Sequence, residues 1–241
     1  MITFGRAAIG APRTTYAMRI DLDMPVSCAD GAFGTLADVI IDPRTRRLTH
    51  IVVQPEDRGR RARLVATEHV RAADMGHAPL EGLVLDCTLA AIDGFESIQE
   101  AAFIRLDEVI ETGPDWDVGI EEAFPVPDGR SLGPEILGAG VAMDYDQHVG
   151  VNYHRIPKGD AEIRRASAVT STDGHDLGHV VGFVIDDDDQ ITELILEHGH
   201  LWGKRTVSVP ARAITQFEID ELVLTLSRDE VGALKPLPGH R

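Results

Sequence analysis

The sequence predicts a mostly β protein made of two tandem small antiparallel β-barrels, joined by an ordered connector with a short helix. Three observations lead to this prediction. The chain repeats itself, because residues 26–95 align with residues 169–234. The offset is 143–144 positions, with Gly34 on Gly178, until a short deletion brings Leu83 onto Leu222. Short runs in each repeat alternate apolar and polar residues, as half-buried strands do. Several such runs within roughly 70 residues favour a small closed sheet.

The repeat divides the chain into four segments. We expect an N-terminal arm at 1–17, a first barrel at 18–96, a connector at 97–160 and a second barrel at 161–241. Each repeat is small for a hydrophobic core of its own. We therefore expect the barrels to pack on each other or on the connector.

The first repeat contains five runs with strand character. They are Met18–Leu22, Thr35–Asp42, Leu48–Gln54, Ala62–Ala66 and Leu83–Cys87. A polar turn at 43–47 separates the second run from the third, which is the pattern of a β-hairpin. Thr88 follows the last run and is a suitable cap for a short helical turn.

The second repeat contains the matching strands. They are Val180–Asp186, Ile191–Glu197, Thr206–Pro210 and Leu222–Leu226. Asp186–Gln190 could suggest a calcium loop, but Ile191 stands where such a loop requires glycine, so a solvated hairpin turn is favoured. Ser227 is the expected cap of a closing helical turn.

The connector begins with Ser97-Ile98-Gln99-Glu100, the spacing of a helix capping box. A short amphipathic helix is expected behind it. Its apolar residues would be Ala101, Ala102, Leu106, Val109 and Ile110. The remainder, to Gly159, is rich in proline, glycine and acidic residues but keeps apolar groups. We expect it to be ordered, mostly irregular and packed across the barrels.

Charge and composition exclude several functional classes. Lys and Arg total 23 against 40 Asp and Glu, giving a net charge of −17. Such a charge repels nucleic acid and anionic lipid, so neither is an expected partner. No apolar run approaches the ~20 residues of a membrane span, and the N-terminus lacks a signal-peptide core. We expect a cytoplasmic protein without membrane insertion.

The two cysteines, Cys28 and Cys87, both lie in the first repeat and have no counterparts in the second. Each sits in an apolar, strand-like setting. Buried free thiols are favoured over a disulfide, which remains the alternative.

The repeats resemble a known family. GHVVGFVIDDDDQITELIL (178–196), HGHLWGKRTVSVPARAI (198–214) and LVLTLSRDEVGALKPLP (222–238) resemble the PRC-barrel family, named for the cytoplasmic domain of the photosynthetic reaction centre H subunit. The corresponding segment of the first repeat is GTLADVIIDPRTRRLTHIVVQPEDRGRRARLVATEHV (34–70). YHRIPKGDAEIRRASAV (153–169) is similar to tandem PRC-barrel proteins of actinobacterial type. The resemblance implies fold better than function.

Members of that family with known roles are assembly or scaffold modules, so the resemblance implies a non-enzymatic interaction protein. The sequence agrees, since it contains no Gly-x-Ser-x-Gly, phosphate-binding loop or Cys-x-x-Cys pattern. We expect a protein partner, no cofactor, and a homodimer as an open possibility. One alternative is a metal- or small-ligand-binding protein that uses the His-rich second barrel. A ribosome-assembly accessory factor is the second alternative, which the negative charge disfavours.

Partner contact is expected at the tips of the second hairpins. The first tip concentrates arginines that can pair bidentately with carboxylates or phosphates. These are Arg58, Arg60, Arg61 and Arg63. The corresponding tip of the second repeat carries Trp202, Lys204 and Arg205. The tryptophan is a suitable interface anchor, although contact with the other barrel or the connector is the favoured alternative for it.

Four histidines of the second repeat are candidate ligands for a transition metal. They are His175, His179, His198 and His200. His198 and His200 would share a face of a strand. However, the glycine-rich hairpin tip around them favours polar residues anyway, so no metal site is expected.

Overall fold

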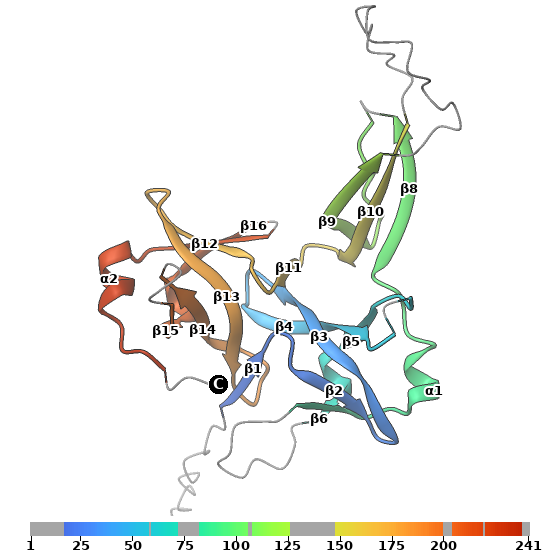
Figure 1. The fold of residues 1–241 in the computed structure, drawn as a ribbon, viewed down its shortest axis with the longest axis horizontal. Helices are drawn as coiled ribbons and strands as arrows, with labels where there is room; N and C mark the ends of the chain where they lie inside the picture. The colour runs from blue at the N-terminus through green and yellow to red at the C-terminus, as the bar shows by residue number, and fades with distance from the viewer. Residues whose placement is uncertain are drawn as a thin grey trace, which may run out of the picture.

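The computed structural model describes residues 17–57, 59–71, 82–105, 108–125, 148–199, 204–218 and 220–237. Within these ranges, curled β-sheets make up most of the protein, which confirms the prediction of a mostly β fold. Two sheets have seven strands and one has three. The three-stranded sheet extends away from the other two (Figure 1).

The first seven-stranded sheet has the order β5-β4-β3-β2-β7-β6, with β11 paired to β3. Its strands are β2 (Pro25–Cys28), β3 (Gly31–Asp42), β4 (Arg47–Pro55), β5 (Arg63–Ala66), β6 (Val70–Arg71), β7 (Leu83–Leu85) and β11 (Ala161–Arg164). A 3₁₀ turn, η1 (Thr67–His69), precedes β6.

The second seven-stranded sheet repeats this order as β15-β14-β13-β12-β17-β16, with β1 paired to β13. Its strands are β1 (Met18–Asp21), β12 (Ala168–Ser171), β13 (Asp176–Ile185), β14 (Ile191–His198), β15 (Arg205–Pro210), β16 (Ile214–Glu218) and β17 (Glu221–Leu224). The 3₁₀ turn η2 (Ala211–Ala213) matches η1. Each sheet contains one parallel pair, β2–β7 or β12–β17, in place of a wholly antiparallel arrangement.

The two sheets exchange their entering strands. β1 opens the first repeat but pairs with β13 of the second sheet, with Met18 opposite Ile185. β11 precedes the second repeat but pairs with β3 of the first sheet, with Ala161 opposite Ile41. The two pairings are equivalent, because 161 − 18 = 143 and 185 − 41 = 144. Figure 1 shows β1 beside β13 and β11 beside β3.

The hairpin turns of the two repeats also meet as a symmetric pair. The amide of Leu48 donates to the carbonyl of Asp189, and the amide of Ile191 donates to the carbonyl of Arg46, both at 2.9 Å. Arg46 and Asp189 both have a positive φ, 57° and 58°. The two repeats are therefore related by an approximate two-fold axis that passes between these turns.

One apolar core runs through both seven-stranded sheets. The exchanged strands place Ile20 and Ile163 in it, each 1% exposed. Phe183 of β13 and Leu36 of β3 belong to the same cluster. Because neither repeat is large enough to bury much apolar surface alone, the exchange gives the two halves a common interior.

Each repeat ends in a short capped helix, as expected. In α1 (Leu89–Ile92) the hydroxyl of Thr88 accepts a hydrogen bond from the amide of Ala91 at 3.2 Å. In α2 (Arg228–Ala233) Ser227 and Glu230 form a complete capping box. Among the described residues there is no helix with the length and apolar character that a membrane crossing needs.

The prediction of a short helix in the connector is wrong. Residues 99–105 form a strand, β8 (Gln99–Arg105), and pair with β10 (His148–Pro157), which also pairs with β9 (Trp116–Pro125). The described connector is therefore a sheet and not mostly irregular. The hydroxyl of Ser97 accepts from the amide of Gln99 and donates to its carbonyl, a local turn that uses the same residues as a capping box. Val109, expected on the apolar helix face, is 83% exposed.

The aligned glycines Gly34 and Gly178 are required by close backbone approach. A Cβ at Gly34 would lie 1.9 Å from the carbonyl oxygen of Gln54, and one at Gly178 would lie 2.0 Å from that of Glu197. We expect Gly34→Ala or Gly178→Ala to lower the free energy of unfolding by roughly 2–4 kcal/mol, measured by urea denaturation.

Gly174→Ala is the matched control, because Gly174 has a φ of +79° but no atom within 4 Å of an added Cβ. It should cost only the left-handed backbone penalty of roughly 1–2 kcal/mol. Equal losses at all three positions would contradict the steric explanation.

Candidate functional site

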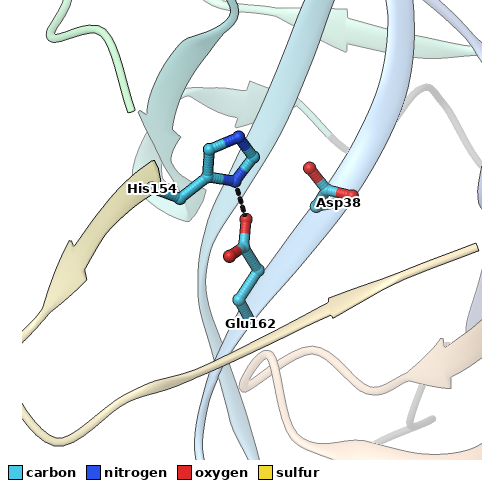
Figure 2. Close-up of side chains that lie close together, drawn as sticks. All are labelled: Asp38, His154 and Glu162. Atoms are coloured by element: carbon cyan, nitrogen blue, oxygen red, sulfur yellow. Dashed lines mark hydrogen bonds and ion pairs between the residues drawn. The ribbon is translucent and has the colours of Figure 1, made fainter. Parts of the chain in front are cut away.

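Three ionisable side chains from three separate strands converge where the first sheet meets the connector sheet. Asp38 comes from β3, His154 from β10 and Glu162 from the exchanged strand β11. One potential ligand atom of each lies within 4.8 Å of the others. Figure 2 shows the imidazole and the two carboxyl groups directed toward a common space. Among the described residues this is the one group of three or more such side chains close enough to hold a metal ion.

Asp38 is buried because both faces of β3 are covered at this point. Val39 points into the shared core, while Ile40 packs on the opposite face against Ile98 and Ile156 of the connector. Asp38 lies on the same face as Ile40. A β-bulge between Leu36 and Asp38 shifts the strand register beside it, a feature that redirects side chains.

Glu162 and His154 form the tightest contact of the site. Glu162 lies opposite Ile40 in the β11–β3 pairing, and its side chain is 2% exposed. His154 Nδ1 lies 2.5 Å from Glu162 Oε1, within hydrogen-bond distance. A Cβ at Gly119 would come within 2.4 Å of Glu162 Oε2, so glycine at this position of β9 makes room for the carboxylate.

The Asp38 carboxyl group has no hydrogen bond to any described residue, although the residue is only 7% exposed. Burial, and then the negative charge of Glu162, raise the pKa of Asp38 to about 7. The charges of His154 and Arg164 oppose this rise. Its oxygens are not sealed from solvent, because Asp38 lines an open cavity and Arg63 Nε is the one enclosed side-chain N or O atom without a partner among the described residues. Buried groups with strongly shifted pKa values concentrate at functional sites.

The pKa of His154 is also raised. Burial acts to lower it, but the hydrogen bond to Glu162 and the charges of Glu162 and Asp38 together outweigh burial. Both His154 and Asp38 therefore hold their protons more tightly in the folded protein than in the unfolded chain.

Arg164 adds little free positive charge to the site. Its guanidinium forms a bidentate pair with Asp220, with Nε–Oδ1 at 2.9 Å and Nη2–Oδ2 at 2.5 Å. Ser167 donates a further hydrogen bond to Asp220 Oδ1 at 2.7 Å. Asp220 therefore balances much of the positive charge that Arg164 brings close to Asp38 and His154.

Asp38 and His154 open onto a cavity of about 370 Å³. Its rim is polar and carries the amides of Gln54 and Asn152 together with Glu122. Glu162 forms part of a second, smaller cavity of about 210 Å³ beside β9. Solvent and small ligands can therefore reach the centre from the larger cavity, while Glu162 closes its far side.

The arginines expected to bind a partner are engaged within the chain. Arg60 pairs with Asp93, Arg61 donates to the carbonyl of Gln99 at 3.3 Å, and Arg63 donates to the carbonyl of Phe95 at 3.1 Å. Arg61 also lines the larger cavity. Arg58 lies outside the described residues.

The structure describes the corresponding hairpin tip of the second repeat only in part. Lys204 pairs with Glu197 at 2.5 Å, and Arg205 donates to the carbonyl of Gly232. Trp202 lies outside the described residues.

The histidines of the second repeat do not converge in the part of the chain that the structure describes. His198 contacts the carbonyl of Leu177 at 2.6 Å, His175 pairs with Asp173 at 3.1 Å, and His179 lies opposite Glu197. His200 lies outside the described residues. These positions give each described histidine a local role.

Sequence reasoning missed Asp38, His154 and Glu162 altogether. A signal was present, because Asp38 interrupts an apolar strand at the position where the second repeat has Gly182. His154 and Glu162 belong to YHRIPKGDAEIRR, whose contact with β3 depends on strand pairings that no local pattern reveals.

The chain matches no protein-family model, and no curated protein matches it.

The raised pKa values predict how the stability of the metal-free protein depends on pH. Below about pH 4 Asp38 is protonated in both states; as pH rises toward 7 the unfolded chain loses this proton first, so stability falls. The stabilisation from His154 is likewise lost as pH rises through its raised pKa. We expect the wild type to lose stability between pH 5 and pH 8. Asp38→Asn should reduce this loss by on the order of 2–4 kcal/mol, measured by urea denaturation with a chelator present.

Asp42→Asn is the control. Hydrogen bonds from Arg44 and Thr45 lower the pKa of Asp42, so its contribution disappears only in acid. This variant should keep the wild-type slope between pH 5 and pH 8. A wild-type slope in Asp38→Asn would refute the assignment of the effect to Asp38.

Proposed function

We propose that the protein binds a divalent transition-metal ion at Asp38, His154 and Glu162. The observation that carries this proposal is the buried Asp38 carboxyl group, which faces an imidazole and a second carboxylate but has no hydrogen-bond partner among the described residues. A cation between the three groups would satisfy it.

The donor set suits metals of intermediate softness. Imidazole nitrogen with carboxylate oxygen is a combination used for Zn²⁺, Mn²⁺ and Fe²⁺, at metal–ligand distances of about 2.0–2.2 Å. Donor atoms around such an ion are ~3–4 Å apart, so the side chains need to close in only slightly from their 4.8 Å limit. Three protein ligands leave at least one coordination position for water or a small ligand from the cavity.

Binding of the metal ion would displace protons that these side chains hold in the metal-free protein. In the metal-free protein a proton lies between His154 and Glu162, and Asp38 is partly protonated near neutral pH. Coordination requires neutral imidazole and ionised carboxylates, so binding releases protons to solvent. The affinity for metal should therefore increase as pH rises from 6 to 8.

Calorimetric titration of chelator-treated, full-length protein tests the proposal. We expect one Zn²⁺ or Mn²⁺ ion per chain, with a heat that depends on the ionisation enthalpy of the buffer because protons are released. Asp38→Asn and Glu162→Gln keep the shape of each side chain but remove its charge. Each should weaken binding by roughly 10–100-fold or more.

Two controls separate this site from nearby charge and from the histidines of the second repeat. Glu122→Gln changes a carboxylate on the cavity rim, and His175→Gln changes an exposed histidine paired with Asp173. Both should bind metal as the wild type does. Unchanged affinity in Asp38→Asn, or stoichiometric binding that is lost in His175→Gln, would refute the proposed site.

The second candidate function is a non-enzymatic interaction scaffold built from two PRC-like barrels, with a protein partner. The identical strand order of the two seven-stranded sheets supports it. A binding role without catalysis also agrees with a sequence that lacks the common nucleophile and phosphate-loop patterns.

The scaffold proposal predicts that partner contact uses the arginine tip. Changing Arg58, Arg60 and Arg61 to Ser should leave the melting temperature almost unchanged, because exposed ion pairs contribute ~0–1 kcal/mol each. The same change should remove proteins that co-purify with the wild type at low salt. Retention of the same co-purifying proteins would count against this surface.

A further inference from the structure

The two cysteines lie side by side at one corner of the first sheet. Cys28 is the last residue of β2, and Cys87 lies between β7 and α1. Their sulfur atoms are 3.8 Å apart, and both thiols are free. The two positions are 59 residues apart in sequence, so the fold itself creates this proximity.

The backbone already holds the two segments together. β2 and β7 pair in parallel, and the amide of Ala29 donates to the carbonyl of Cys87 at 2.8 Å. One residue further on, Asp30 accepts a hydrogen bond from the amide of Leu89 at 2.7 Å. Closing the pair needs the sulfur atoms to approach from 3.8 Å to the ~2.05 Å of a disulfide bond.

We propose that Cys28 and Cys87 are a redox-active pair that closes to an intramolecular disulfide when a low-molecular-weight disulfide oxidises it. Burial makes the two partners unequal. Cys28 is 4% exposed and belongs to the shared core, whereas Cys87 is half-buried and lies at its edge. The pair is asymmetric, with an accessible first thiol and a protected second one.

The reaction proceeds by two exchange steps. The Cys87 thiolate attacks one sulfur of the external disulfide, whose S–S bond breaks and releases one thiol. The Cys28 sulfur then loses its proton, attacks the mixed disulfide at Cys87 and releases the second thiol. In total, two protein thiols become one disulfide, and two electrons and two protons pass to the external disulfide, which becomes two thiols.

The environment of Cys28 fixes this order. Burial, the hydrogen bond to Cys87 and the nearby charge of Asp30 raise the pKa of Cys28 to about 12. A thiol with so little thiolate cannot begin the exchange, but it can complete it once the mixed disulfide is held beside it.

The disulfide would stabilise the first sheet. It would close a loop that contains β3, β4, β5, β6 and β7, and cross-links over long loops remove the most freedom from the unfolded chain. The oxidised protein should therefore melt at a temperature roughly 4–10 °C higher than the reduced protein.

The test equilibrates full-length protein with graded mixtures of reduced and oxidised glutathione and stops the exchange with acid. The free thiols are then alkylated in denaturant at neutral pH, where they form thiolates. The wild type should lose both thiols together, with a mass lower by two hydrogen atoms. Cys28→Ser should keep one glutathione on Cys87, because no second thiol resolves it. Cys87→Ser should remain unmodified, because Cys28 is buried.

Three results would overturn the proposal. They are wild type that keeps both thiols in strongly oxidising mixtures, wild type that stops at glutathione-bound Cys87, and disulfides that link two chains. The wild-type thiol count and mass decide between these outcomes even if a cysteine variant folds poorly.

Discussion

The reciprocal pairing of β1 with β13 and of β11 with β3 is the constraint on which the rest of the structure depends. Each entering strand completes the sheet of the other repeat and carries its apolar side chains, such as Ile20 and Ile163, into one core. Turns with left-handed residues, Asp23 and Ala166, follow the exchanged strands in both halves. Arg165 donates a hydrogen bond to Asp23 at 2.8 Å, so these two turns also touch. The halves are therefore interlocked rather than merely adjacent.

The same exchange explains why, among the described residues, the candidate site is found in one repeat and not in the other. The position of Glu162 on β11 corresponds to Arg19 on β1, since 162 − 19 = 143. Asp38 corresponds to Gly182, where a Cβ would lie 2.4 Å from the carbonyl oxygen of Ile20. Ile98 and Ile156 of the connector pack against Ile40 at the first of these two places, which contributes the burial that the site needs. The two repeats therefore differ at this place. The first carries ionisable side chains, whereas the second has Gly182 in close contact with the backbone of β1.

Much of the local structure is readable in the sequence, and the long-range pairings are not. The alternation of apolar and polar residues predicts β3 and β14, and the capping residues Thr88 and Ser227 predict the starts of α1 and α2. Both signals depend only on neighbours along the chain. Alternation tells which face of β1 is buried but not which strand it meets. Residues 97–105 satisfy both a helix and a strand pattern, and pairing with β10, about fifty residues away, decides between them. The candidate site takes one residue from each of three strands that only long-range pairing brings together, so it could not be predicted from the sequence.

The exchanged strands also have a consequence for the biosynthesis of the chain. Met18 meets Ile185 across a sequence separation of 185 − 18 = 167 residues, and Asp38 meets Arg164 across 126. Chains of such high contact order fold slowly, because distant segments must meet before their contacts stabilise anything. As the polypeptide leaves the ribosome, the first sheet must wait for β11, and Ile20 must wait for β13 of the second repeat. Translation of the C-terminal half therefore controls when the N-terminal half becomes native.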